Sequence, residues 1–259
     1  MDLATTQYIK WVVSSIEDLQ GLVRSLEGSI ETALAGASEE TEGISKGYIS
    51  TDSFGVAESS IRNTLYNSVG RIAHLIESRK MFMRDNILGE YQRTAEKKLT
   101  PKQILNIRAK IESNEIDPYG KTLRDRVDLG RDMAYRDIGN DLLRTRFKNV
   151  KEKIRQRLLK DTDVRGISYP RWSKRLLVAE IQRTAQLTLL YALHEQGVEW
   201  YSWNLSSRHY EVWKKYKKYV PGQEICEIRS ENSPYTYEEM KKYLPAHVSC
   251  ACMPSMFKY

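Results

Sequence analysis

The sequence has few Cys, His and Phe residues and no long apolar run. Its 259 residues include 3 Cys, 4 His and 4 Phe, against 16 Tyr. No apolar run in it approaches the roughly 20 residues that a membrane-spanning helix needs. The first residues have neither the basic nor the apolar stretch of a signal peptide. We therefore expect a chain made in a reducing cytosol, where cysteines more often serve as thiols or metal ligands than form disulfides.

Motifs typical of nucleotide-binding enzymes and of cysteine nucleophiles are also missing. The sequence contains no G-x-x-x-x-G-K-[ST] and no G-x-G-x-x-G pattern. It has no Gly-rich oxyanion loop, and no Asn or Asp stands beside a His that could act as a base. We therefore expect a protein that is not an enzyme. The excess of Tyr, an aromatic residue with a polar end, suits contacts with other subunits.

Apolar residues recur at the helical period in two early stretches. Residues 8–34 and Ile61 to Ile76 each have such a stripe, and we expect two helices there. The intervening residues 35–55 are rich in Gly, Ser, Thr and Glu, which predicts a loop. Ser59 or Ser60 is the expected N-cap of the second helix, because a hydroxyl there can accept from the first free backbone N–H groups.

Two more helices are expected before the part of the chain that also contains strand signals. Thr100 followed by Pro101 is a helix start signal, since Pro fits the first helical position. A further apolar stripe begins at Leu123 and is expected to continue past Leu142 toward Ile154. No alternating strand pattern occurs in the first two thirds of the chain, which we expect to be all-helical.

The last part of the chain combines helix and strand signals. A helix is expected from about Arg171 to Gln196, ended by Gly197. Residues 198–203 are aromatic and β-branched and predict a strand, and Thr236 is the expected cap of a short helix to Tyr243. The predicted fold class is mainly α: a helical body at residues 1–145, a basic helical segment at 146–197, and a small α+β module at 198–259.

Positive charge is concentrated in one segment. From Arg144 to Arg183 there are 13 Lys and Arg against 4 Asp and Glu, a net charge of +9, whereas the whole chain carries +7. Such a segment is typical of a surface that meets phosphates, although a solvated helix face is an equally good interpretation of charge alone. The candidate phosphate-binding residues are Lys148, Lys151, Lys153, Arg155, Arg157, Lys174 and Arg175.

The sulfur and imidazole groups gather at the C-terminal end. His247, Cys250 and Cys252 lie within eight residues of one another, and Cys226 and His209 are further candidates upstream. Four such N and S ligands are what a tetrahedral structural zinc requires, and a module of this size gains from a staple. Two alternatives stay open: thiols packed in a core beside a hydrogen-bonded His, and a disulfide between Cys226 and one of the other two.

Two separated motifs have a familiar pattern. The first runs from Ala179 through Ala185 as A-E-I-Q-R-T-A, followed by a Gly and a strand with Trp; the second ends in P-x-H-x-x-C-x-C. In order and spacing they resemble the phage Mu F-like minor head proteins, also called head morphogenesis proteins, over about residues 150–254. The residues that carry the resemblance are Glu180, Arg183, Thr184, Gly197, Trp203, Arg208, His209, Pro245, Cys250 and Cys252.

The resemblance implies a structural virion component of a tailed bacteriophage. Such a late protein would be assembled in the host cytoplasm and lie in few copies inside the capsid, near the portal vertex. Its partners would be the portal protein, capsid or scaffold proteins and phage DNA bound without sequence preference, with no membrane involved. It would assist head assembly and DNA packaging or ejection, with residues 1–145 docking on portal or capsid. The alternative is a cytosolic zinc-stapled nucleic-acid-binding module.

Overall fold

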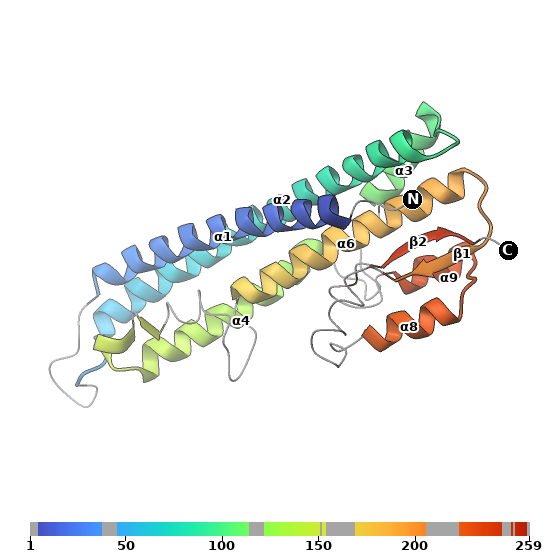
Figure 1. Ribbon diagram of the computed structural model, residues 1–259. Helices are drawn as coiled ribbons and strands as arrows, with labels where there is room; N and C mark the ends of the chain where they lie inside the picture. The colour runs from blue at the N-terminus through green and yellow to red at the C-terminus, as the bar shows by residue number, and fades with distance from the viewer. Residues whose placement is uncertain are drawn as a thin grey trace. The chain divides into compact units, whose positions relative to one another are not determined.

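The computed structural model describes residues 5–37, 46–113, 122–150, 152–153, 169–205, 223–244, 250 and 252–257. The fold is mainly α with a small C-terminal α+β module, as the sequence predicts. Within the described residues, none of the helices combines the length and apolar character needed to cross a membrane. The elements labelled in Figure 1 are, in chain order, α1 (Thr5–Ala35), α2 (Thr51–Thr94), α3 (Pro101–Ser113), α4 (Leu123–Arg144), α6 (Tyr169–Glu195), β1 (Tyr201–Asn204), α8 (Gln223–Glu231), α9 (Tyr237–Tyr243) and β2 (Met253–Met256).

The start of α2 corrects one expectation. The helix begins at Thr51, so Ser59 and Ser60 lie inside it and do not cap it. Instead the Ser50 hydroxyl accepts from the backbone N–H of Ser53 at 3.3 Å, as an N-cap does. The apolar stripe misplaced the start because α2 begins with the polar residues Thr51, Asp52 and Ser53, and Ala57 is the first buried hydrophobic residue in the helix.

The end of α4 corrects another. The helix stops at Arg144 and does not continue into Phe147, since Thr145 has extended backbone angles, with φ −106° and ψ 133°. The Phe147 N–H donates to the Gly47 carbonyl at 2.8 Å, a contact with a segment 100 positions earlier in the chain. Ile154, the expected continuation, lies outside the described residues.

The chain forms two compact units, each discontinuous in sequence. Unit 1 comprises residues 1–15, 76–115 and 177–259, and unit 2 comprises residues 16–75 and 116–176. The predicted boundaries at residues 145 and 197 were drawn from composition and helix signals, and they stay predictions.

Unit 2 is a packing of helix against helix. Its buried stripes come from α1, from α2 and from α4, with a shorter contribution from the first turns of α6. Trp172 of α6 lies against Gly130 of α4, and its indole N–H donates to the Arg126 carbonyl at 2.8 Å. The buried apolar residues of these stripes include Leu19, Val23, Leu26, Ile30, Ile61, Leu65, Val69, Ile72, Val127, Ile138 and Leu142.

Unit 1 contains the C-terminal module, which we define as β1, α8, α9 and β2, packed with the later part of α6. β1 and β2 are antiparallel, with Tyr201 opposite Met256 and Trp203 opposite Pro254 (Figure 1). The expected strand at 198–203 is thus found slightly later, and Gly197, with φ +82°, ends α6 in the left-handed conformation that glycine favours.

The short helix α9 matches its sequence signal residue by residue. The Thr236 hydroxyl accepts from the Glu239 N–H, and the Glu239 carboxylate accepts from the Thr236 N–H at 2.9 Å, which makes a capping box. The expected start of α3 is also confirmed, because the Thr100 hydroxyl accepts from the backbone N–H of Gln103 at 3.3 Å and Pro101 is the first helical residue.

Candidate metal centre

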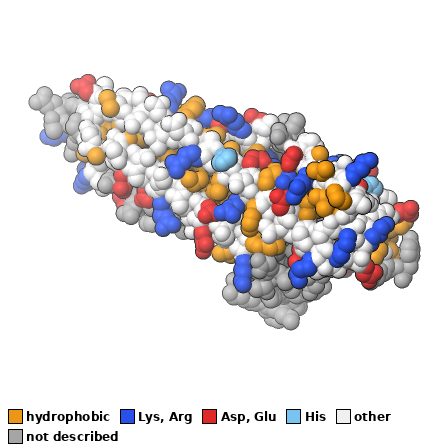
Figure 2. Space-filling model, turned by 90° about the horizontal axis from the view of Figure 1, so that it is seen from above, with side chains coloured by type: hydrophobic (Ala, Val, Ile, Leu, Met, Phe, Trp, Pro, Cys, Tyr) orange, Lys and Arg blue, Asp and Glu red, His pale blue; other side chains and the backbone are white. Residues whose placement is uncertain are grey.

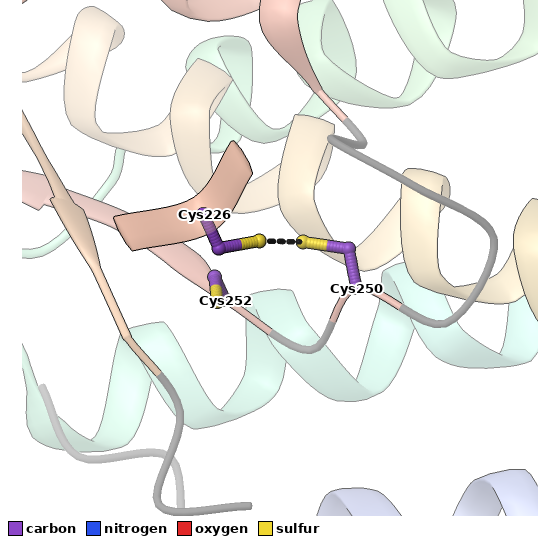
Figure 3. A group of neighbouring side chains, drawn as sticks. All are labelled: Cys226, Cys250 and Cys252. Atoms are coloured by element: carbon purple, nitrogen blue, oxygen red, sulfur yellow. Dashed lines mark hydrogen bonds between the residues drawn. The ribbon is translucent and has the colours of Figure 1, made fainter. Parts of the chain in front are cut away.

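Three cysteine thiols come together in the C-terminal module. Cys226 lies in α8, Cys252 directly precedes β2, and Cys250 lies two residues earlier, so the cluster joins segments 24 positions apart in the chain. The Sγ atoms of Cys226 and Cys250 are 3.6 Å apart, and the sulfur atoms of all three residues lie within 4.8 Å of one another (Figure 3). Cys226 is 0% exposed, Cys250 1% and Cys252 2%.

The spacing of the last two cysteines explains how they share a site. Cys252 directly precedes β2 and Cys250 lies two residues earlier, so both thiols enter the site from the chain that leads into this strand. Cys226 approaches from α8, where it is the buried residue between the exposed Ile225 and Ile228. α8 and the chain leading into β2 therefore meet at one buried site.

Distances between the sulfur atoms fit a metal ion. A tetrahedral zinc with Zn–S bonds of about 2.3 Å separates its sulfur ligands by roughly 3.8 Å. The Cys226–Cys250 distance of 3.6 Å is close to that value, and the third thiol is near enough to join them. The three cysteines are therefore close enough to hold a metal ion. None of the three forms a disulfide here, and the 3.6 Å between the Cys226 and Cys250 sulfur atoms far exceeds an S–S bond of about 2.05 Å.

The environment also keeps the Cys226 thiol protonated in the absence of a metal. Hydrogen bonds with Cys250 and Cys252, and then burial, raise the pKa of the Cys226 thiol. A neutral, buried thiol is a poor nucleophile. A bound metal would reverse this balance, because it binds thiolates and releases their protons.

One side chain that the sequence analysis did not identify links the cluster to α6. Gln186 is fully buried, and its Nε2 donates to the Cys250 carbonyl at 3.0 Å and to the Cys252 carbonyl at 2.7 Å. The same nitrogen lies 3.6 Å from Cys250 Sγ. A signal was present, because Gln186 is a polar residue in a stretch otherwise suited to a buried helix, but nothing local indicated its partners 64 and 66 positions away.

Several predicted site residues fall outside the described residues. This holds for His209 and His247 among the metal candidates, for Arg208 and Pro245 among the motif residues, and for Lys151, Arg155 and Arg157 among the basic ones. Of the remaining basic candidates, Lys148, Lys153 and Arg175 are exposed and Lys174 is half-buried. On the face seen in Figure 2, Lys and Arg side chains lie interspersed with Asp and Glu.

The described motif residues are structural in their contacts. Glu180 is buried, and a carboxylate oxygen lies 3.8 Å from the ammonium of the equally buried Lys80 of α2. Trp203 is 1% exposed, and its ring faces the Arg229 guanidinium, which also lies over Tyr243. Arg229 further donates to the Tyr243 carbonyl and so joins α8 to the end of α9.

The remaining motif residues lie along α6 or at its end. Thr184 is buried and Arg183 is half-buried. Gly197 supplies the left-handed turn that ends the helix.

Comparison with known proteins finds no relative. No protein-family model matches the chain, and neither a curated protein nor a solved structure matches it. The resemblance to the Mu F-like minor head proteins therefore depends on the motif residues alone.

Proposed function

We propose that this chain is a structural minor head protein of a tailed bacteriophage, associated with the portal inside the capsid. Its main support is that the two motif segments, well separated in sequence, pack together: Gln186 of α6 binds the backbone at Cys250 and Cys252, and Trp203 lies opposite Pro254. A pattern shared by two distant segments is best explained when they build one folded module. In this role the protein assists head assembly and DNA packaging or ejection.

The proposed role is structural and not catalytic. The three thiols are buried, and the pKa of Cys226 is raised by its hydrogen bonds to the other two. A catalytic cysteine needs the opposite, a partly exposed site that stabilises the thiolate. Glu180, a charged motif residue, is paired with Lys80.

We further propose that the three cysteines hold a structural zinc. The sulfur distances suit tetrahedral coordination, and among its described residues the module's sheet consists of two strands of four residues each. A small module with so little regular structure gains from a metal that ties α8 to the end of the chain. Elemental analysis of protein purified without added metal tests this directly. Less than about half a zinc per chain would overturn the zinc proposal.

Quantitative mass spectrometry of purified capsids tests the location. With the major capsid protein as internal reference, the chain should appear in far fewer copies and should co-purify with the portal after the outer shell is removed. Its absence from particles would overturn the minor head proposal.

A second candidate function, a cytosolic zinc-stapled nucleic-acid-binding module, is favoured by the thiol cluster together with the exposed Lys148 and Lys153. A protein of this class would bind nucleic acid in the cytosol and have no place in the particle. The capsid experiment therefore separates the two, since both allow zinc and DNA binding.

The proposed DNA contacts are tested by changing charge. The variant replaces Lys148, Lys151, Lys153, Arg155 and Arg157 by Gln, and the matched control replaces Lys10, Arg24, Lys46, Lys97 and Lys102, five basic residues that are exposed in the structure. If the first set meets phosphates, its loss weakens duplex binding equally for all sequences and flattens the salt dependence, because fewer counterions are released. If both sets of substitutions weaken binding equally, the proposal that residues 148–157 form a dedicated DNA contact is wrong.

A further inference from the structure

Gln186 has the position of a residue that orders the metal ligands. It reaches from α6 to the backbone on both sides of the C-x-C pair, and a single amide nitrogen donates to the carbonyls of Cys250 and Cys252 at 3.0 and 2.7 Å. Because one nitrogen holds both carbonyls, the two cysteines keep a constant spacing and direction. Two ligands of a three-thiol site are thereby held by a group that is not itself a thiol.

The side chain of Gln186 is locked in place. It is 0% exposed and lies on α6 between Ala185 and Leu187, which are also buried. A buried rotamer on a packed helix has little freedom, so the amide is positioned before any metal arrives. Groups outside the ligand set that orient metal ligands in this way commonly change metal affinity by about 10- to 100-fold when removed.

The other end of the same amide also points to a ligand at this place. The Gln186 Oε1 atom is buried and accepts no hydrogen bond from the described residues. A buried acceptor of this kind is uncommon in folded proteins, and a bound water or ion beside it is one explanation. The bonded Nε2 atom lies 3.6 Å from Cys250 Sγ, which puts the amide beside the thiols.

We infer that Gln186 is a positioning residue of the cysteine site: its amide holds Cys250 and Cys252 ready to bind a thiophilic divalent metal. This inference rests on the proposed metal site. The site is then preorganised by α6, and metal binding joins α6, α8 and the chain leading into β2. In this arrangement the helix that carries the first sequence motif contributes to metal binding without supplying a ligand.

The test compares two glutamines one turn apart on α6. Gln182 is also buried, at 2% exposed, and its Oε1 likewise has no hydrogen-bond partner among the described residues. Within the same residues, no hydrogen bond joins Gln182 to the cysteines. Gln186→Met and Gln182→Met keep the side-chain length and volume and remove the amide, so both test a buried amide in the same helix. Only the first removes the bonds to the cysteine carbonyls.

The measurement is Co²⁺ and Zn²⁺ binding to the full chain. Co²⁺ is followed by its visible absorption, which reports a tetrahedral thiolate site, and Zn²⁺ by competition with a chromogenic chelator. We expect Gln186→Met to weaken binding about 10- to 100-fold and to alter the Co²⁺ spectrum, while Gln182→Met keeps the wild-type affinity and spectrum.

Each other outcome is decisive. If the wild type binds neither metal, the metal proposal fails and Gln186 has nothing to position. If the wild type binds and the two variants behave alike, the metal site stands and the role of Gln186 is overturned.

If Gln186→Met does not fold, the wild type answers the question. In ¹⁵N-glutamine-labelled protein, Zn²⁺ should shift the side-chain NH₂ signals of Gln186 and leave those of Gln182 in place. Unchanged Gln186 signals on saturation with Zn²⁺ would overturn the inference.

Discussion

The unit 2 helices and the C-terminal module are stabilised by different kinds of contact. In unit 2, apolar stripes from α1, α2 and α4 bury one another along their length. The module also buries Tyr201, Trp203 and Met240, but it adds contacts from single polar or sulfur groups: three thiols, the Arg229 guanidinium and the Gln186 amide of the adjoining α6. A repeated stripe distributes stability over many residues, whereas the module depends on a few. Perturbing one group should therefore matter far more in the module.

The largest expected effect is removal of the metal. If zinc is bound, a strong chelator should unfold the module, because apparent binding free energies of structural zinc reach about 10 kcal/mol and couple directly to folding. Hydrogen exchange followed region by region should show β1, α8, α9 and β2 losing protection while α4 keeps it. Cys250→Ser should act like the chelator. Equal loss of protection in α4 would show that the metal does not stabilise the C-terminal module selectively.

The buried ion pair of unit 1 is expected to give the next largest effect. Lys80→Met leaves the Glu180 carboxylate buried without this cation, and breaking such a pair typically costs about 3–5 kcal/mol. Both side chains are 6% exposed. The double variant Lys80→Met/Glu180→Leu should recover most of the lost stability, because it removes both charges of this buried pair.

A control for the ion pair is available on the same helix. Arg93 pairs with Glu90 at the surface, and its side chain is 73% exposed. Arg93→Met should leave chemical denaturation unchanged, since solvent screens an exposed pair. If Lys80→Met is equally silent, the Lys80–Glu180 contact contributes nothing to the stability of unit 1.

A close contact in unit 2 gives a smaller effect. A Cβ atom at Gly130 would lie 2.3 Å from the Trp172 ring, so Gly130→Ala should destabilise unit 2 by about 1–3 kcal/mol through overpacking. The control is Gly139→Ala in the same helix, where a Cβ meets nothing within 4 Å. That change should stabilise the helix by up to about 1 kcal/mol, the propensity difference between the two residues. Thermal unfolding of both variants measures the contrast.

The smallest effects compare the two capping boxes, one in each region. Thr122 caps α4 in unit 2 with Asp125, and Thr236 caps α9 in the module with Glu239. Replacing an N-cap Thr by Ala typically costs about 1 kcal/mol. Thr122→Ala should lower protection in α4 alone and Thr236→Ala in α9 alone, as followed by hydrogen exchange. Loss in both regions from either change would show that the units unfold together.

The module's capping box also has a predictable pH dependence. Hydrogen bonds from the Thr236 backbone N–H and then from its hydroxyl lower the pKa of Glu239 from its ordinary value of 4.5. A lowered folded-state pKa means that the stabilisation is present above pH 4.5 and is lost as the pH falls through the folded-state value. The difference in α9 protection between wild type and Thr236→Ala should therefore shrink in acid.

Much of the helical structure could be predicted from local patterns. The stripe over 8–34 gave α1 within a few residues at each end, and the Thr100-Pro101 signal placed the start of α3 correctly. Gly197 was the correct stop for α6. These signals succeed because a helix is built from contacts three and four residues apart, so its periodicity and caps are written in neighbouring positions.

The errors occur where a distant contact or an unusual start decides a boundary. α4 ends early beside the contact between Phe147 and Gly47, and α2 begins in a polar turn at Ser50 that no apolar stripe announces. The helix α8 was not predicted, nor was β2, whose partner strand lies about 50 positions earlier. The local sequence of these boundaries and elements does not indicate which distant segments they contact.

The sequence by itself determined that the chain is mainly helical, where its charge is concentrated and which cysteines were candidates for a common site. The tertiary structure decided that all three thiols converge, that Gln186 holds two of their carbonyls, and that Glu180 is buried with Lys80. The reason is the range of the interactions. Helix periodicity and capping act between near neighbours, whereas a sulfur cluster or a buried ion pair exists only after folding brings distant residues within a few ångströms.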